Sequence, residues 1–153
     1  MPDSGRVEPL NGPVFGLAPA GVVCHPRRAV YAVIARPDGR VAAIRASLRD
    51  GTSRYWLPGG GMEANESTED TVVREVREEL GRGVRVHAEV GSAVQYFYAG
   101  DEGRWYEMKV SFVRGVLDDR PVDSGEYDLH WVDVREVAAL FFHECHAWAA
   151  SQV

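Results

Sequence analysis

The chain has 153 residues, of which 45% are apolar and 26% are charged. These values are close to those of ordinary globular domains, so they exclude a disordered or fibrous protein. The length suits one domain, and no apolar stretch is long enough to cross a membrane. The net charge is −6 and there is no basic stripe, which argues against a protein that coats nucleic acid or an anionic membrane.

The first 27 residues contain five of the eight prolines of the chain and predict an irregular arm, with room for one short strand. A single domain is expected over residues 28–153. Prolines interrupt the apolar run of the arm, which therefore lacks the continuous core of a secretory signal peptide. The two cysteines, Cys24 and Cys145, are too few for a disulfide framework, and a cytoplasmic location with reduced thiols is expected.

Apolar and β-branched runs predict the strands of the domain. Residues 29–35 and 41–46 are expected to pair as a hairpin, because Pro37 presets φ and Gly39 supplies a positive φ in the turn between them. Further strands are expected over 54–57, 84–98, 104–116 and 129–134, and short helical segments over 135–141 and 144–151. Strands that precede, separate and follow helices predict a layered α/β domain with a mixed sheet.

The strongest helix signal covers residues 67–80. Ser67 with Asp70 three residues later is an N-cap pattern, and Gly81 is a C-terminal stop. At 3.6 residues per turn, one apolar stripe of this helix is expected to be buried. The stripe consists of Val72, Val73, Val76 and Leu80.

Three carboxylates, Glu75, Glu78 and Glu79, lie at positions i, i+3 and i+4 of the same helix, beside the apolar stripe. Like charges at this spacing repel one another, and partial burial increases the cost. A bound cation would offset that cost, and carboxylate oxygens suit Mg²⁺ or Mn²⁺. The alternative is a helix face that is simply solvated.

A glycine loop, residues 58–61, precedes the helix and fits the same site. Its glycines let the backbone approach a ligand closely, its carbonyl groups can complete an oxygen shell, and the helix start offers N–H groups to phosphate. Arg74 can pair with Glu66 across the junction of loop and helix, which would orient the ligands.

This segment resembles the signature box of the Nudix hydrolases, the family that includes MutT-like enzymes. The matching pattern is Gly60-x5-Glu66-x7-Arg74-Glu75-Val76-x-Glu78-Glu79-x-Gly81. The lead-in at 57–63 and the later segment Glu126-x4-Trp131 extend the resemblance over residues 28–151. The pattern has an apolar residue where this chain has Arg82, and Val84 is expected to supply that side chain.

The resemblance implies an α/β/α sandwich around a central mixed sheet. It also implies divalent-metal-dependent hydrolysis of a pyrophosphate bond in a nucleoside diphosphate linked to another moiety. The metal, Mg²⁺ or Mn²⁺, would be held by Glu75, Glu78, Glu79, Glu126 and the Gly59 carbonyl. Catalysis would depend on Glu75 as the base, with Glu78 and Arg74. The scaffold of the box would consist of Gly60, Glu66, Arg74 and Gly81.

A small nucleotide-type substrate follows from the resemblance: a nucleoside triphosphate, a dinucleoside polyphosphate or a nucleotide sugar. Tyr96, Tyr98 and Arg45 are candidate substrate contacts, and core packing is the other interpretation of the tyrosines. No membrane element or DNA-binding segment is expected, and a homodimer stays open. Two alternatives remain: a non-catalytic Nudix-like sensor domain, and a zinc-dependent hydrolase that uses His143 and His146.

Overall fold

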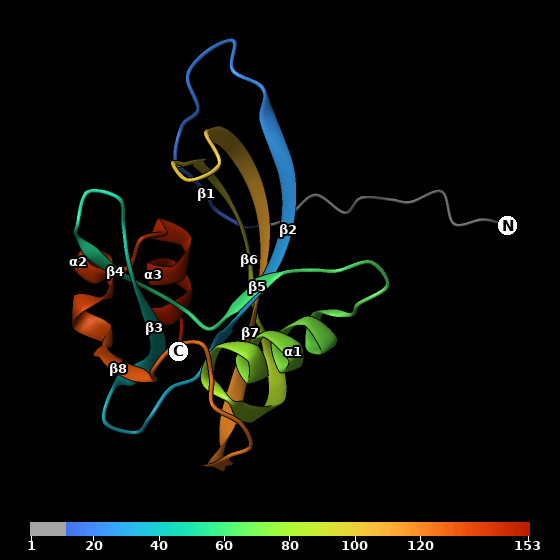
Figure 1. Ribbon diagram of the computed structural model, residues 1–153, viewed down its shortest axis with the longest axis vertical. Coiled ribbons are helices and arrows are strands. Elements are labelled where there is room, and N and C mark those ends of the chain that lie inside the picture. Colours follow the sequence, from blue (N-terminus) through green and yellow to red (C-terminus); the bar gives the residue numbers. More distant parts are fainter. Residues whose placement is uncertain (1–11) are drawn as a thin grey trace, which may run out of the picture.

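A computed structural model describes residues 12–153 (Figure 1), so the start of the expected N-terminal arm lies outside the described residues. The strands are β1 (Val14–Phe15), β2 (Cys24–Val33), β3 (Arg40–Ser47), β4 (Ser53–Trp56), β5 (Gly59–Gly61), β6 (Arg82–Ala99), β7 (Arg104–Pro121) and β8 (His130–Asp133). The helices are α1 (Thr68–Leu80), a 3₁₀ turn (Val134–Glu136), α2 (Val137–Leu140) and α3 (Glu144–Ala150). None of the helices within residues 12–153 has the length and apolarity that a membrane crossing requires.

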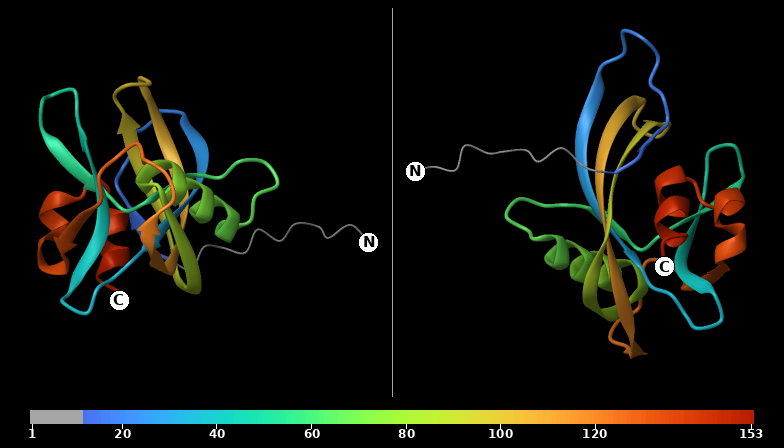
Figure 2. Two further views of the ribbon diagram at one scale, coloured as in Figure 1. Left: turned by 60° about the horizontal axis from the view of Figure 1, so that its bottom comes forward. Right: turned by 180° about the vertical axis from the view of Figure 1, so that it is seen from behind.

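The strands form two sheets, a larger one in the order β1-β6-β7-β2-β5 and a smaller one in the order β4-β3-β8. The larger sheet is mixed, because β2 runs parallel to β7 whereas β6 and β7 form an antiparallel hairpin. Helix α1 lies on one side of the long strands, and α2, α3 and the smaller sheet lie on the other (Figure 2). The expected α/β/α sandwich with a central mixed sheet is therefore confirmed.

The prediction that residues 29–35 and 41–46 pair as a hairpin is wrong except at the turn between them. The turn forms, with a bridge between Ala35 and Val41, but β3 then pairs with β4 and β8 in the smaller sheet. Both edges of β2 are already used, one by β7 and the other by β5. Strand β2 also begins at Cys24, earlier than the sequence pattern indicates.

The glycine segment, expected to be a loop, forms strand β5 and pairs antiparallel with β2. Gly59 lies opposite Tyr31 and Gly61 lies opposite Ala29. At Gly59 φ is +146°, and a Cβ there would lie 2.2 Å from the Val30 carbonyl oxygen, so no larger residue fits. The pairing makes the glycines an edge strand of the larger sheet, fixed against β2.

Local signals set the limits of α1 as expected. Ser67 caps its start in a reciprocal capping box with Asp70, and Gly81 ends it in the left-handed conformation, with φ of 64°. The buried stripe of α1 differs from the predicted one. Val73, which was expected to be buried, is 40% exposed, whereas Glu79 is only 8% exposed. A carboxylate therefore lies on the buried face of the helix.

The two core clusters lie on opposite faces of β2, because successive side chains of a strand alternate. One face of β2 packs against α3 and Leu57, through Ala29, Tyr31 and Val33. The other face packs against α1 through Val30 and Ala32, and Ile34, the residue after the strand, joins the same cluster. Val84 is buried in this second cluster, as expected for the residue that replaces the apolar side chain missing at Arg82.

Candidate functional site

The acidic face of α1 lies against the glycine strand. The backbone N–H of Gly59 donates a hydrogen bond of 2.8 Å to Oε1 of Glu79. Burial and, to a smaller extent, the negative charges of Glu75, Glu126 and Glu78 raise the pKa of Glu79 to about 8. The site thus holds a buried carboxyl group that needs a proton or a cation.

Glu75 lies directly over Gly60. A Cβ added at Gly60 would lie 2.7 Å from the carboxyl carbon of Glu75, so the glycine makes the space that this carboxylate fills. Glu75 accepts a hydrogen bond of 2.8 Å from Arg74, and partial burial raises its pKa despite this contact. Glu78 is more exposed and lies 3.4 Å from Arg74.

Arg74 joins the helix to the glycine strand. Its guanidinium donates two hydrogen bonds to the carboxylate of Glu66, at 2.7 and 2.9 Å, and a third of 3.0 Å to the carbonyl oxygen of Gly61. The pair lowers the pKa of Glu66 to about 2. The contact expected from the sequence is therefore present, and it fixes the loop between β5 and α1.

Glu126 reaches the same region from the loop that follows β7. The backbone N–H of Glu126 donates to the carbonyl oxygen of Glu78 at 3.0 Å, and that of Tyr127 donates to Glu79 at 2.8 Å. These bonds use carbonyl groups at the C-terminal end of α1 that the helix itself leaves without partners. They bring a fourth acidic residue beside the three of the helix.

The donor chemistry of this cluster fits a hard divalent cation, since all of its groups are oxygens and one is a buried acid. The carboxylates do not converge, however: within residues 12–153 no three His, Cys, Asp or Glu side chains form a group that could hold an ion. Glu75 is bonded to Arg74 and Glu79 to the Gly59 amide. Ion binding therefore requires these side chains to rearrange.

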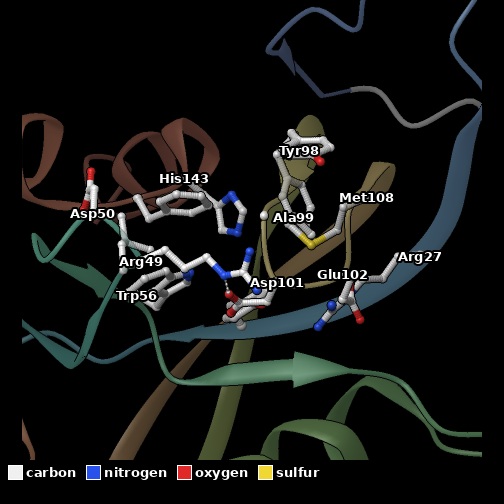
Figure 3. A pocket seen from close by; sticks show the side chains of 15 residues that line it. Arg27, Arg49, Asp50, Trp56, Tyr98, Ala99, Asp101, Glu102, Met108 and His143 are labelled. Carbon is white, nitrogen blue, oxygen red and sulfur yellow. Dashed lines mark ion pairs between the residues drawn. The ribbon is translucent and has the colours of Figure 1, made fainter.

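A pocket of about 620 Å³ opens on the other face of the sheet (Figure 3). Aromatic side chains form much of its wall, namely Tyr31, Trp56, Phe97, Tyr98 and Phe142. Trp56 and Phe142 stack with their ring centroids 5.1 Å apart. Arg49 and Asp101, from two different loops, also line the pocket and form an ion pair with a nitrogen–oxygen distance of 3.1 Å. Flat apolar walls with charged groups are typical of pockets for planar polar ligands.

Arg27 connects the pocket with the acidic cluster. Its side chain lines the pocket, and its Nη2 atom lies 3.8 Å from the position that a Cβ of Gly61 would take. The guanidinium forms no ion pair with any carboxylate of the described part of the chain. A half-buried arginine without a carboxylate partner is available to an anionic ligand.

Of the three residues expected to contact the substrate, Tyr96, Tyr98 and Arg45, one lines the pocket. Tyr98 lines the pocket, whereas the hydroxyl group of Tyr96 donates to Glu107 at 3.0 Å. Arg45 is exposed on β3 and does not line the pocket. Sequence reasoning named Tyr98 but missed Arg27 and the other aromatic residues of the wall, since no local motif marks residues that only the fold brings together.

Comparison with known proteins agrees with this geometry. A family model described as the NUDIX domain matches residues 25–150. The chain belongs to the Nudix family. Its Nudix box extends from Gly60 in β5 to Gly81, the C-cap of α1, whereas Glu126 comes from the loop after β7 and Arg27 from β2.

One curated relative is a Mycobacterium tuberculosis protein provisionally named 8-oxo-dGTP diphosphatase 3, to which the chain is 31% identical over 112 residues. This match covers 71% of this chain and 52% of the relative. The chain thus spans about half the length of the first curated relatives that it matches. It is 29% identical over 133 residues to the RNA pyrophosphohydrolase of Gluconacetobacter diazotrophicus, which covers 71% of this chain and 77% of that protein. The crystal structure of a MutT NUDIX hydrolase from Burkholderia pseudomallei is 26% identical, with a TM-score of 0.59 and coverage of 84% and 98%.

Proposed function

We propose that this Nudix chain hydrolyses a pyrophosphate bond in a nucleoside diphosphate linked to another moiety, with a divalent metal ion. The observation that carries the proposal is the buried carboxyl group of Glu79, hydrogen bonded to the glycine strand and surrounded by three further acids. The names of the two curated relatives, a diphosphatase and a pyrophosphohydrolase, support the same reaction class.

Glu75, Glu78 and Glu79 would hold the metal, with Glu126 and the Gly59 carbonyl as further ligands. When bound, Mg²⁺ or Mn²⁺ neutralises the diphosphate and lowers the pKa of water. The chain supplies the orientation: Arg74 fixes the loop through Glu66, and the bonds from the 126–127 loop fix the end of α1. Preorganised charge of this kind is the main source of rate acceleration in phosphoryl transfer.

Glu75 is the residue to which we assign the role of general base. Its carboxylate is partly buried, which raises its pKa and makes it a better proton acceptor. In the metal-free protein the hydrogen bond from Arg74 holds it over Gly60, and metal binding would shift it from this contact. Glu75 then takes the proton of the attacking water, and the water oxygen forms the new bond to phosphorus as the bridging oxygen leaves.

The pocket and Arg27 would bind the nucleotide. Aromatic walls bind a base by stacking, and the guanidinium of Arg27 suits a phosphate oxygen at the side nearest the glycine strand. A nucleoside triphosphate, a dinucleoside polyphosphate and a nucleotide sugar all combine these two parts.

A product-release assay over these three substrate classes, with Mg²⁺ or with chelator, tests the proposal. Hydrolysis is expected only with the metal ion, and Glu78→Gln is expected to lower kcat by about a hundredfold or more. The matched control is Glu69→Gln, an exposed glutamate in the first turn of the same helix, which should retain wild-type rates. Tight nucleotide binding without turnover under any metal would instead favour the non-catalytic sensor domain.

A further inference from the structure

The segment that leads into α3 is fixed at three points. The N–H of Phe142 donates to the Tyr55 carbonyl at 3.0 Å, and the N–H of Cys145 donates to Oε1 of Gln95 at 3.1 Å. Nδ1 of His146 accepts a bond of 3.1 Å from the Leu57 N–H. These contacts reach two different sheets, so the segment is held rigidly beside the pocket.

His143 lies in the middle of this segment and is only 5% exposed. Its ring packs edge to face on Phe97, at 4.6 Å between centroids, and on Phe142, at 4.8 Å. Its imidazole nevertheless lines the pocket and lies beside Arg49 and Trp56 (Figure 3). Its ring nitrogens form no side-chain hydrogen bond within the described residues, and they are not fully enclosed, since Nε2 of His146 is the one fully buried side-chain atom there that lacks a partner. These nitrogens are therefore open to the pocket, and a ligand bound there can supply their hydrogen-bond partner.

We propose that His143 determines substrate specificity, by hydrogen bonding to the edge of a planar heterocyclic base held in the pocket. This inference rests on the proposed function, because it takes the ligand to be a nucleotide. Burial lowers the pKa of His143 to about 3, with a smaller effect from Arg27, so the ring is neutral under ordinary conditions. A neutral imidazole offers one donor and one acceptor, which matches the mixed edge of a nucleobase.

His146 does not share this role, although its ring lies 5.0 Å from that of His143. It is fully buried, packs at 4.1 Å on the Tyr31 ring and does not line the pocket. The bond that its Nδ1 accepts from Leu57 places it in the core, where its Nε2 has no hydrogen-bond partner within residues 12–153 and is closed off from the pocket. The two histidines therefore divide into one that faces the core and one that faces the ligand.

Binding of nucleoside monophosphates to metal-free protein tests the inference without depending on turnover. The probes are AMP, GMP, CMP and UMP, with ribose 5-phosphate as the ligand that lacks a base, and the affinities are measured by titration calorimetry. The wild type is expected to bind its preferred monophosphate about tenfold or more tightly than the weakest of the four, because a base that leaves a buried polar group unpaired binds poorly.

His143→Phe keeps an aromatic ring against Phe97 and Phe142 but removes both nitrogens. With this variant the affinities for the four monophosphates are expected to lie within about twofold of one another, and the affinity for ribose 5-phosphate is expected to be unchanged. His143→Gln, which keeps a hydrogen-bonding side chain, is expected to restore part of the preference among the four bases. His87→Phe, at an exposed position of β6, is the matched control and should behave as the wild type. Thermal melting confirms that each variant is folded.

Unchanged ratios among the four bases in His143→Phe would overturn the inference, as would an equal loss for ribose 5-phosphate or a wild type that does not distinguish the bases. Hydrolysis is measured separately with Mg²⁺. Its absence would contradict the proposed function alone, because the binding ratios would still decide the role of His143.

Discussion

At the scale of single residues, two arginines of the site differ in what surrounds them. Arg74 is held by Glu66 and Glu75, so its charge is already balanced by the protein. Arg27 forms no ion pair within residues 12–153 and lies between the pocket and the glycine strand. The first arginine therefore positions the machinery, and the second is available to the substrate.

Replacing Arg27 tests this division. Arg27→Gln is expected to raise KM about tenfold or more with little change in kcat, because a charged hydrogen bond made equally to the bound substrate and the transition state is lost. Steady-state kinetics with the preferred substrate give both constants. Arg85→Gln, at an exposed position of β6, is the control, and an unchanged KM in Arg27→Gln would contradict the assignment.

The sequence predicted residues whose partners lie close along the chain. The pairing of Arg74 with Glu66 follows from the box pattern, and the structure contains it. Arg27 could not be found in this way, because a single arginine in a strand carries no signal of its own. His143 was noticeable in composition, but only the fold shows that it faces a pocket.

At the scale of elements, the contact between β5 and α1 forms the core of the site. The two elements touch where Gly60 meets the carboxylate of Glu75 and where the Gly59 amide meets Glu79. The spacing between strand and helix is therefore set by the absence of a side chain at Gly60.

Adjacent glycines of β5 provide a matched pair of variants. Gly60→Ala would bring a methyl group to within 2.7 to 2.9 Å of the Glu75 carboxyl group, whereas Gly61→Ala would meet its neighbours at an ordinary 3.8 Å. Displacement of the base by even a small distance is expected to lower kcat about a hundredfold in Gly60→Ala and much less in Gly61→Ala. Comparable kcat values in the two variants, both shown to be folded by circular dichroism, would refute this account.

Local signals were sufficient for α1 but not for the sheets. Ser67 and Gly81 limit the helix through contacts within a few residues. The hairpin prediction failed because β2 takes as its parallel partner β7, which is distant in the sequence. Strand β5 was missed because three glycines have low strand propensity, and they are ordered by pairing with β2.

At the scale of the whole molecule, titratable groups are buried on both faces of the large sheet. Glu79 lies on the α1 side and its pKa is raised to about 8. His143 and His146 lie on the α3 side, with the pKa of His143 lowered to about 3 and that of His146 also well below its ordinary value. Each group favours its neutral form in the folded state, so the two faces respond to pH in opposite directions.

The free energy of unfolding of the metal-free protein is therefore expected to be greatest near pH 6.5, the ordinary pKa of the histidines, because below it the two histidines destabilise the fold more than Glu79, with its ordinary pKa of 4.5, stabilises it, and above it Glu79 alone acts. The contribution of Glu79 is complete below pH 4.5 and is lost as the pH rises through about 8. That of His143 is complete above pH 6.5 and is lost as the pH falls toward 3. Urea denaturation with chelator from pH 4 to pH 9 measures both declines.

Glu79→Gln separates the two effects. The neutral amide can still accept the bond from Gly59, so this variant is expected to lose the alkaline decline and to keep the acid one. Near neutral pH it should be at least as stable as the metal-free wild type although it is inactive. A decline of the same size above pH 7 would show that Glu79 is not its cause.

Strand β2 divides its residues between two tasks, because its odd-numbered side chains face the pocket side and its even-numbered ones face α1. A substitution that reshapes the cavity wall on one side leaves the packing of α1 on the other side intact. Substrate preference can thus diverge during evolution by changes at alternate positions of one strand, while the reaction itself is inherited unchanged.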